Sequence, residues 1–449
     1  MKTLEQAAER YWNPMIETLP LERLRELQLR KFVKILEWAY ERSKFHRRLY
    51  QEAGLEPGDI KTWDDIRQVP KVDKGMMRSI QGKEPFPYGE ALCVPLEEVV
   101  EFRQTSGTTG QPVYQPDTWA DWEWWSECWA YLLYAQGFRK RDRCFLPFGY
   151  NVFVAFWAGH YAAEKIGCEV VPGGVLDTAA RILKMQEVKA TAMMATPSYV
   201  LTLADTAKTR LHLDPAKDLT VRKIVCAGEP GAGIPGTRKR MEEAWGAKVF
   251  DHVGATEIGA WGFECQEQAG LHINEAFFLA EVEDLVTGEP ITQPGRQGKL
   301  VITALDRQAQ PCIRFDSKDI VEWAEGLCPC GRTFRLFKGG VLGRTDDITK
   351  VKGVLLSPTA IEEVVRTVPE LADEYQVLVR KKGDTDEIVL KVEIRPGAEG
   401  RREEAAERLK DLLRLKTNLN YLIEFQPFQS LPRPEGKARR FLDLRKKAT

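Results

Sequence analysis

A run of hydroxyl and glycine residues from Ser106 to Gly110 is the stretch of this chain best suited to binding an anion. The run reads Ser106, Gly107, Thr108, Thr109 and Gly110, and Gln111 and Pro112 follow it. Glycines let the backbone turn tightly and bring amide N–H groups close to a phosphate, while the hydroxyls add donors. No Lys-Ser/Thr pair follows Gly110, so this is not a Walker A loop. Taken alone, the run fits a polyphosphate loop and an ordinary flexible loop equally well.

Companion motifs further along the chain favour the phosphate-binding interpretation. In chain order they are Gly228-Glu229-Pro230, Gly254-Ala255-Thr256-Glu257, Asp319, Gly343-Arg344-Thr345-Asp346-Asp347 and Gly436-Lys437. With this ordered set the chain resembles the acyl-adenylate-forming superfamily and, within it, the phenylacetate–coenzyme A ligase family. The resemblance extends from Tyr11-Trp12-Asn13-Pro14 to Leu431–Lys437, which is almost the whole chain. It implies that an organic acid attacks the α-phosphate of ATP, and that coenzyme A then displaces AMP from the acyl-adenylate.

The resemblance also implies roles for individual residues in adenylation. Residues 106–110, with Thr109 counted as catalytic, would hold the β- and γ-phosphates. Glu257 would coordinate Mg²⁺, a cation that prefers oxygen ligands. Lys437 would bring the carboxylate and the α-phosphate together and stabilise the developing charge. The alternative for Lys437 is a solvated basic tail, because several arginines surround it.

Further residues are expected around the nucleoside and coenzyme A, again by resemblance. Adenine would lie against Gly228, Glu229 and Pro230 and against the strand end Asp251, His252 and Val253, with Gly254 and Thr256 leading to Glu257. Asp319 would accept hydrogen bonds from the ribose, and Arg344 would lie near the ribose or the α-phosphate. Asp346 corresponds to the hinge of a small mobile domain, and Gly353 would approach the pantetheine arm.

Two departures from the family pattern concern charge near the nucleotide. Gln111 stands where relatives usually carry a lysine after the phosphate loop. The loss of that cation would weaken the hold on pyrophosphate unless another Lys or Arg replaces it. Asp316-Ser317-Lys318 precedes Asp319 where relatives commonly show Arg-Thr-Arg or Arg-Thr-Gly.

A second group of residues predicts a structural zinc site. Cys265 and His272, together with Cys328 and Cys330, supply three thiols and an imidazole, the right number and softness for closed tetrahedral Zn²⁺. The zinc would pin a hairpin region over 262–335, and free buried cysteines are the alternative. Because four protein ligands leave no open position, a catalytic zinc is not expected.

Aromatic residues crowd the segment where the acid should bind. The pocket is expected between Phe148–Gly159, Cys226–Gly228 and His252–Trp261, and the rings are those of Phe148, Tyr150, Phe153, Phe156 and Trp157. Such a lining suits an aromatic carboxylic acid, with phenylacetate as the leading candidate, although the rings could instead fill the core. Two other functions stay open: a relative that stops at adenylylation or acylates an amine, and a nucleotide-binding regulatory protein.

Composition narrows the functional class. The chain has 449 residues, 43% of them hydrophobic and 29% charged, with a net charge of −1. This near-neutral net charge argues against nonspecific electrostatic binding to nucleic acid or to anionic membranes. Neither a signal-peptide pattern nor an apolar run of membrane-spanning length occurs, and nine cysteines are expected to be reduced. A cytoplasmic enzyme is the expectation, and a homodimer is compatible with it.

Alternating strand and helix patterns must position these residues. Strands are predicted at 143–146, 169–171, 191–195, 223–226 and 248–251, and helices at 19–53, 119–138, 155–166, 178–187, 199–209 and 236–245. This pattern favours an α/β fold with a largely parallel sheet, whose strand ends carry the ligand. A hairpin is predicted over 277–302, and helices at 358–368 and 401–415 flank paired strands at 376–380 and 388–394. The domains are therefore placed at 1–345, a large multi-sheet adenylate-forming domain, and 346–449, a small mobile α+β domain.

Overall fold

The computed structural model describes residues 9–105, 111–352, 354–382, 385–433, Ala438 and 440–445, in two compact units. Unit 1 comprises Met1–Val175, Ala190–Met194 and Phe250–Gly340, and unit 2 comprises Leu176–Lys189, Ala195–Val249 and Val341–Thr449. The domain boundary at 345/346 stays a prediction, since the last segment shares its unit with Ala195–Val249. No helix in these described residues is long and apolar enough to cross a membrane.

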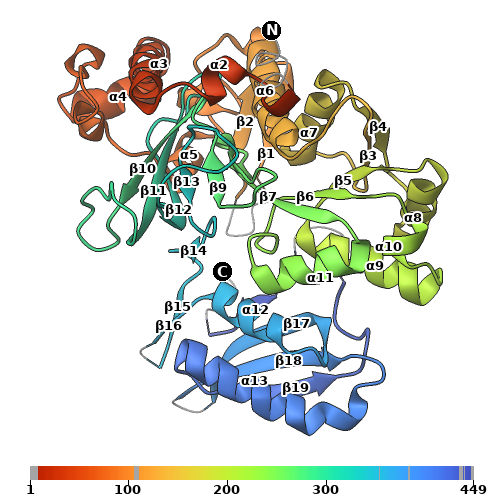
Figure 1. Cartoon of the computed structure of the whole chain (residues 1–449). Helices are drawn as coiled ribbons and strands as arrows, with labels where there is room; N and C mark the ends of the chain where they lie inside the picture. Colours follow the sequence, from red (N-terminus) through yellow and green to blue (C-terminus); the bar gives the residue numbers. More distant parts are fainter. Residues whose placement is uncertain are drawn as a thin grey trace. The chain divides into compact units, whose positions relative to one another are not determined.

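Unit 1 begins with helices that cover its first core. After the short α2 (Pro14–Glu17) come α3 (Leu21–Arg42) and α4 (Lys44–Glu52), shown in red and orange in Figure 1. The predicted helix over 19–53 is thus two helices, because Ser43 adopts an extended conformation and its hydroxyl caps α4. Phe32, Leu36 and Tyr50 pack in one buried cluster that also contains residues of the later sheet. Helix α5 (Lys74–Ile80) follows, with the side chain of Asp73 as its N-cap.

The predicted phosphate loop, residues 106–110, is flanked in the chain by a strand pair and followed by an aromatic helix. Strands β1 (Glu101–Gln104) and β2 (Tyr114–Asp117) pair antiparallel on either side of it. Helix α6 (Trp119–Ala135) starts at a capping box between Thr118 and Asp121. Four of its five tryptophans, Trp122, Trp124, Trp125 and Trp129, are buried, as expected for a helix packed in the core, whereas Trp119 at its first position is exposed.

The parallel strands of unit 1 occur close to their predicted positions, but the strand at 169–172 is an edge strand and is not buried as predicted. β3 (Arg143–Leu146) pairs in parallel with β4 (Glu169–Pro172) and with β5 (Ala192–Ala195). Helix α7 (Ala155–Lys165) packs on β3, β4 and α6.

Antiparallel strands complete unit 1 and extend the predicted pattern. β7 (Lys248–Ala255), β8 (Gly259–Phe263), β9 (Leu271–Ile273) and β13 (Leu336–Phe337) are neighbours in that order. A separate antiparallel set contains β10 (Phe278–Glu283), β11 (Gln297–Ala304) and β12 (Phe315–Glu322), which confirms the predicted hairpin. One expectation is wrong: β7 does not end at Asp251, because pairing with β8 continues it to Ala255.

Unit 2 contains one buried strand with helices and the C-terminal module. β6 (Lys223–Cys226) is accompanied by α8 (Thr178–Glu187), α9 (Pro197–Arg210), α10 (Pro215–Asp218) and α11 (Pro235–Trp245). Strand β14 (Gly343–Arg344) precedes the C-terminal module. The module consists of β15 (Thr349–Val351), β16 (Val354–Leu356), α12 (Pro358–Thr367), β17 (Leu371–Lys382), β18 (Thr385–Ile394), α13 (Arg402–Thr417), β19 (Leu422–Gln426) and β20 (Phe441–Asp443).

The C-terminal module is built on a four-stranded sheet of order β19-β18-β17-β20. Strands β17, β18 and β19 are labelled in Figure 1. The predicted pair β17–β18 is antiparallel, whereas β19 and β20 add in parallel at the edges. Apolar residues of α12 and α13, such as Ile361, Leu409 and Leu413, form one buried cluster with Val377 and Leu390 of the sheet. These residues give the module a hydrophobic core of its own.

Candidate active site and metal centre

Glu257, the predicted Mg²⁺ ligand, lies in the turn between β7 and β8. Its side chain is only 5% exposed, and Lys74 Nζ lies 2.9 Å from Glu257 Oε1. Lys74 is the first residue of α5, directly after the capping residue Asp73. The structure therefore pairs the predicted metal ligand with a cation that sequence reasoning missed, and the only signal for it was the missing lysine at position 111.

The buried side chain of Arg307 is hydrogen-bonded to the backbone of the same turn. Its Nη1 donates to the carbonyl of Thr256 at 2.7 Å and to that of Glu257 at 3.2 Å. On the opposite side, Nη2 and Nε donate to Asp117 Oδ1 at 2.7 and 3.1 Å. Burial raises the pKa of Asp117 to about 6, although Arg307 opposes the shift. Nothing in the local sequence around Arg307 or Asp117 predicts this arrangement.

Residues 106–110, which include the predicted catalytic Thr109, lie outside the described residues. Their flanks form the base of a hairpin, since Val113 N donates to Thr105 Oγ1 at 2.9 Å. At the far side of the loop, Arg78 of α5 donates from Nε to the carbonyl of Gln111 at 2.7 Å. Helix α5 therefore brings two basic residues to this region, Lys74 at Glu257 and Arg78 at Gln111.

In the predicted adenine strand end, Asp251–Val253, the first two residues are buried and Val253 is half-buried. Asp251 and His252 are bonded to β8 and to the residue after it. Asp251 N donates to Glu264 Oε2 at 2.8 Å. His252 Nδ1 is 2.8 Å from the carbonyl of Gly262, which fixes the proton on Nδ1, and the ring packs edge-on against Trp129. Burial lowers the pKa of His252 to about 4, so the ring is neutral at pH 7.

Asp319, the predicted ribose ligand, lies within β12 and is buried. Its amide donates to Ser317 Oγ at 3.1 Å. Nearby Asp316 is paired with Lys299 and Lys318 at 3.1 and 2.7 Å. Two lysines therefore neutralise the acidic residue that stands where the family resemblance leads us to expect an arginine.

In unit 2, Glu229 connects the turn after β6 to helix α9 and to the C-terminal module. Its Oε1 accepts from Ser198 N at 2.8 Å, and its Oε2 accepts from Ala438 N at 2.5 Å. Burial raises the pKa of Glu229. Gly228 has a φ of 93°, a conformation that favours glycine at this turn. Lys437 itself, like Gly353, lies outside the described residues.

Helix α11 contacts the C-terminal module through Arg240. This arginine donates to Asp373 Oδ1 at 2.9 Å and to the carbonyls of Ala372, Arg366 and Val368 at 3.1–3.3 Å. Burial lowers its pKa to about 10. Four acceptors on a single guanidinium anchor the module to α11 in this arrangement.

Arg344, predicted near the ribose or α-phosphate, forms a fork with the predicted hinge residue. Its Nε and Nη2 each lie 2.9 Å from a carboxylate oxygen of Asp346. The side chain of Arg344 is 38% exposed, so the pair lies at the surface of unit 2.

The aromatic residues predicted around the acid form a half-buried cluster in unit 1. Phe148 stacks on Phe156 with ring centroids 4.4 Å apart, and Tyr150 contacts Trp157 edge-on at 4.6 Å. Tyr150 Oη is 2.7 Å from His160 Nδ1. Phe153 is 43% exposed. Because these rings are not sealed in the core, they remain available to line a pocket.

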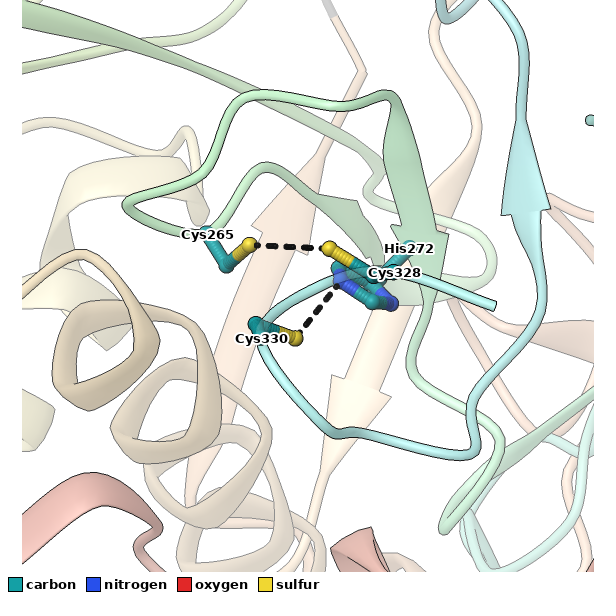
Figure 2. A group of neighbouring side chains, drawn as sticks. All are labelled: Cys265, His272, Cys328 and Cys330. Carbon is teal, nitrogen blue, oxygen red and sulfur yellow. Dashed lines mark hydrogen bonds between the residues drawn. The ribbon is translucent and has the colours of Figure 1, made fainter. Parts of the chain in front are cut away.

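The four predicted zinc ligands converge in unit 1 (Figure 2). Cys265 follows β8, His272 lies on β9, and Cys328 and Cys330 lie on one loop before β13. All four are buried, and their ligand atoms lie within 4.8 Å of one another. Cys265 Sγ is 3.6 Å from Cys328 Sγ, and Cys330 Sγ is 3.5 Å from His272 Nε2. Three thiols and one imidazole at such separations match a tetrahedral Zn²⁺ site.

The surroundings of the cluster orient its ligands. His272 Nδ1 is 3.1 Å from the carbonyl of Phe334, which leaves Nε2 to face the thiols. Hydrogen bonds from the other thiols lower the pKa of Cys330, which favours the thiolate that a metal requires.

The N-terminal segment is bonded to the loop that carries Cys328 and Cys330. Tyr11 Oη donates to the carbonyl of Cys330 at 2.9 Å, and Arg332 Nε donates to the buried carboxylate of Glu17. Thr333 Oγ1 donates to the carbonyl of Leu19 at 2.6 Å.

Comparison with known proteins gives relatives over nearly the full length. A phenylacetate–coenzyme A ligase of Thermus thermophilus is 34% identical, with 97% of this chain and all of the relative aligned. A phenylacetate–coenzyme A ligase of Escherichia coli is 30% identical, with 96% of this chain and 97% of the relative aligned. A model of the AMP-binding enzyme C-terminal domain matches residues 353–445.

The solved structures most usefully compared with this chain are also acyl-CoA ligases. A 2-hydroxyisobutyryl-CoA ligase in the postadenylation state, bound to an acyl-AMP, superposes with a TM-score of 0.90 at 28% identity, covering 97% of this chain and 93% of that one. The same ligase in an open conformation with 2-HIB-AMP and CoA gives a TM-score of 0.74.

Proposed function

This chain belongs to the phenylacetate–coenzyme A ligase family and is an AMP-forming acid–CoA ligase, and we propose that its acid is aromatic, with phenylacetate as the leading candidate. The observation that carries the family is the agreement of four phenylacetate–coenzyme A ligases, at 30–34% identity over nearly the whole chain. The aromatic substrate is further supported by the half-buried rings of Phe148, Tyr150, Phe156 and Trp157.

Adenylation needs two anions to be brought together, and the chain's own cations can neutralise them. In this proposal the amides and hydroxyls of residues 106–110 hold the β- and γ-phosphates, and Lys437 approaches the acid carboxylate and the α-phosphate. Asp319 accepts from the ribose, and Arg344 can exchange Asp346 for phosphate or ribose oxygens. Preorganised donors of this kind usually give the largest catalytic stabilisation.

Mg²⁺ fits the carboxylate of Glu257, an oxygen donor held in a fixed turn. When bound, the ion would neutralise charge on the phosphates of ATP. Lys74 lies 2.9 Å from this carboxylate and is our candidate to replace the lysine missing at Gln111. We infer that Lys74 leaves the carboxylate to the metal and binds a phosphate oxygen.

Structural Zn²⁺ fits the group Cys265, His272, Cys328 and Cys330. The donor set is complete and buried, so the ion would close the loops around β8, β9 and β13 and take no part in the reaction.

The second half-reaction places coenzyme A against the C-terminal module. We propose that the module moves about Asp346, withdraws Lys437 and brings Gly353 to the pantetheine arm. The bonds of Glu229 and Arg240 to the module would break in that movement.

The proposal is tested by incubating the purified protein with ATP, Mg²⁺, coenzyme A and a panel of acids. Mass spectrometry should detect an acyl-CoA together with AMP, and aryl or arylacetic acids should react fastest. Exclusive use of aliphatic acids would overturn the aromatic assignment. Acyl-adenylate without any acyl-CoA would overturn the choice of acceptor.

A further inference from the structure

The buried ion pair between Arg307 and Asp117 joins two parts of unit 1 that are distant in sequence. Both side chains are 0% exposed, and Arg307 Nη2 lies 2.7 Å from Asp117 Oδ1. Trp125 Nε1 donates to the same oxygen at 3.3 Å, and the guanidinium lies over the Trp125 ring. The tryptophan therefore fixes both partners.

The guanidinium nitrogen that does not bind Asp117, Nη1, is hydrogen-bonded to the turn that carries Glu257. Arg307 Nη1 donates to the carbonyls of Thr256 and Glu257 at 2.7 and 3.2 Å. The carboxylate of Glu257 is bonded to Lys74. One cation thus fixes the backbone of the predicted metal ligand, and another cation contacts its side chain.

Asp117 connects this arrangement to the strand pair that flanks the predicted phosphate loop, at the end of the pair away from the loop. It is the last residue of β2, the strand that leaves the loop, and pairs in register with Glu101 of β1. Strand β1 ends at Gln104, immediately before the loop. The chain Thr256/Glu257–Arg307–Asp117–β2 therefore connects the metal-binding turn to the frame of the phosphate loop.

A buried ion pair is weak support for stability alone, because desolvation offsets the attraction between the charges. The planar guanidinium can, however, donate in fixed directions to a carboxylate and two carbonyls at once, which lysine cannot do. We propose that Arg307, held by Asp117, is a positioning residue that sets Glu257 at the distance from the phosphate loop that Mg²⁺·ATP requires. This inference rests on the proposed function, since it assigns Glu257 to the metal.

The test compares Arg307→Gln, Arg307→Lys and Asp117→Asn with the wild-type enzyme. Calorimetric titration with Mg²⁺·ATP is the first readout, and it does not depend on turnover. We expect Arg307→Gln to weaken binding about tenfold or more and to slow acyl-adenylate formation to a similar extent. Thioester formation from a synthetic acyl-adenylate and coenzyme A should stay within about twofold of the wild type.

Arg307→Lys should be intermediate in Mg²⁺·ATP affinity, because an ammonium group can reach only some of the four contacts. Asp117→Asn keeps an oxygen acceptor but loses the charge, so its effect should be smaller than that of Arg307→Gln. These two conservative variants decide the question if Arg307→Gln does not fold.

Arg314→Gln is the matched control. Arg314 is also buried, pairs with Glu281, and donates to the carbonyls of Arg67 and Val69 at 2.8 and 2.7 Å. It should lower the melting temperature as much as Arg307→Gln does, with unchanged Mg²⁺·ATP affinity. Equal affinity losses in both variants, or wild-type affinity in folded Arg307 variants, would overturn the inference. A wild-type enzyme that binds Mg²⁺·ATP but activates no acid would instead refute the proposed function.

Discussion

The carboxylate of Glu229 and the backbone amide of Ala438 are hydrogen-bonded at 2.5 Å. Ala438 directly follows Lys437, the predicted adenylating lysine, so this bond fixes the chain next to that residue. The other oxygen of Glu229 is committed to Ser198 at the start of α9. Glu229 therefore connects the turn after β6 with the segment that carries the predicted adenylating lysine.

Glu229→Gln is expected to slow adenylation selectively. The amide cannot accept from both Ser198 and Ala438 as the carboxylate does, so the hold on the lysine segment weakens. A hydrogen bond to a charged group contributes about 1.5–3 kcal/mol, which corresponds to roughly 10- to 100-fold in rate. Rapid-quench assays should show this loss in acyl-adenylate formation, with normal thioester formation from a preformed acyl-adenylate.

The control for that prediction is Glu242→Gln on α11. Glu242 also accepts a hydrogen bond from a backbone amide, that of Val249 at 3.1 Å, but it is not bonded to Ala438. Its adenylation rate should equal that of the wild type. Equal slowing of both half-reactions in Glu229→Gln would contradict the role given to the bond.

Lys74→Gln is expected to raise the KM for ATP about tenfold, since it removes the cation beside Glu257. Gln111→Lys in the same chain should restore part of the affinity, because it places a lysine where the family resemblance leads us to expect one. Lys71→Gln is the control: Lys71 is equally exposed at 37% and pairs with Glu283 instead. An unchanged KM in Lys74→Gln would show that the cation is not used for phosphate.

Removing zinc is expected to destabilise the protein without touching the reacting groups. Purified, untagged wild type should contain about one zinc per chain, as four protein ligands imply. Cys328→Ser should lose the metal and cost roughly 2 kcal/mol or more of unfolding free energy. Cys93→Ser, a buried cysteine outside the group, should keep the zinc. Elemental analysis showing no zinc in the wild type would remove the site.

Stability should fall on mild acidification because of buried His46. Burial lowers the pKa of this ring to about 4, whereas an unfolded histidine has about 6.5. Below pH 6.5 the unfolded chain therefore binds a proton that the folded chain refuses, and stability is lost down to pH 4. The cost from this residue between pH 7 and pH 5 is about 2 kcal/mol.

Urea unfolding of wild type and His46→Gln at pH 7, 6 and 5 measures how steeply the free energy of unfolding falls with pH. The variant should lose less stability over this range, although it is less stable at pH 7 because it lacks the contact between His46 and Tyr50. His252, buried in the same unit, shifts in the same direction and maintains a residual slope. Parallel curves for the two proteins would contradict the assignment.

Helices and strands were predicted correctly from the sequence where the local residue pattern is enough to determine them. Helix α6 is bounded by a capping box and filled with buried aromatic residues, and β3 coincides with its predicted limits. The extension of β7 to Ala255 and the edge strands β19 and β20 were not predicted, because they depend on distant pairing partners.

In the candidate site, too, residue type alone predicted some residues, whereas others depend on contacts between distant parts of the chain. The cysteines and the histidine were predicted from residue type, and the structure brings their ligand atoms together. Lys74, Asp117 and Arg307 carry no such signal, since a lysine, an aspartate or an arginine gains meaning only from what it faces in the fold. The positions of residues 106–110 and Lys437 around a nucleotide remain predictions.

The bonds of Tyr11 and Glu17 to the loop of Cys330 and Arg332 have a practical consequence for recombinant work. A shortened version beginning at Leu21 would strand the buried guanidinium of Arg332 without its counter-ion and uncover the thiols. Such a truncation should yield protein that oxidises readily and aggregates, even though every group assigned to the nucleotide is still encoded.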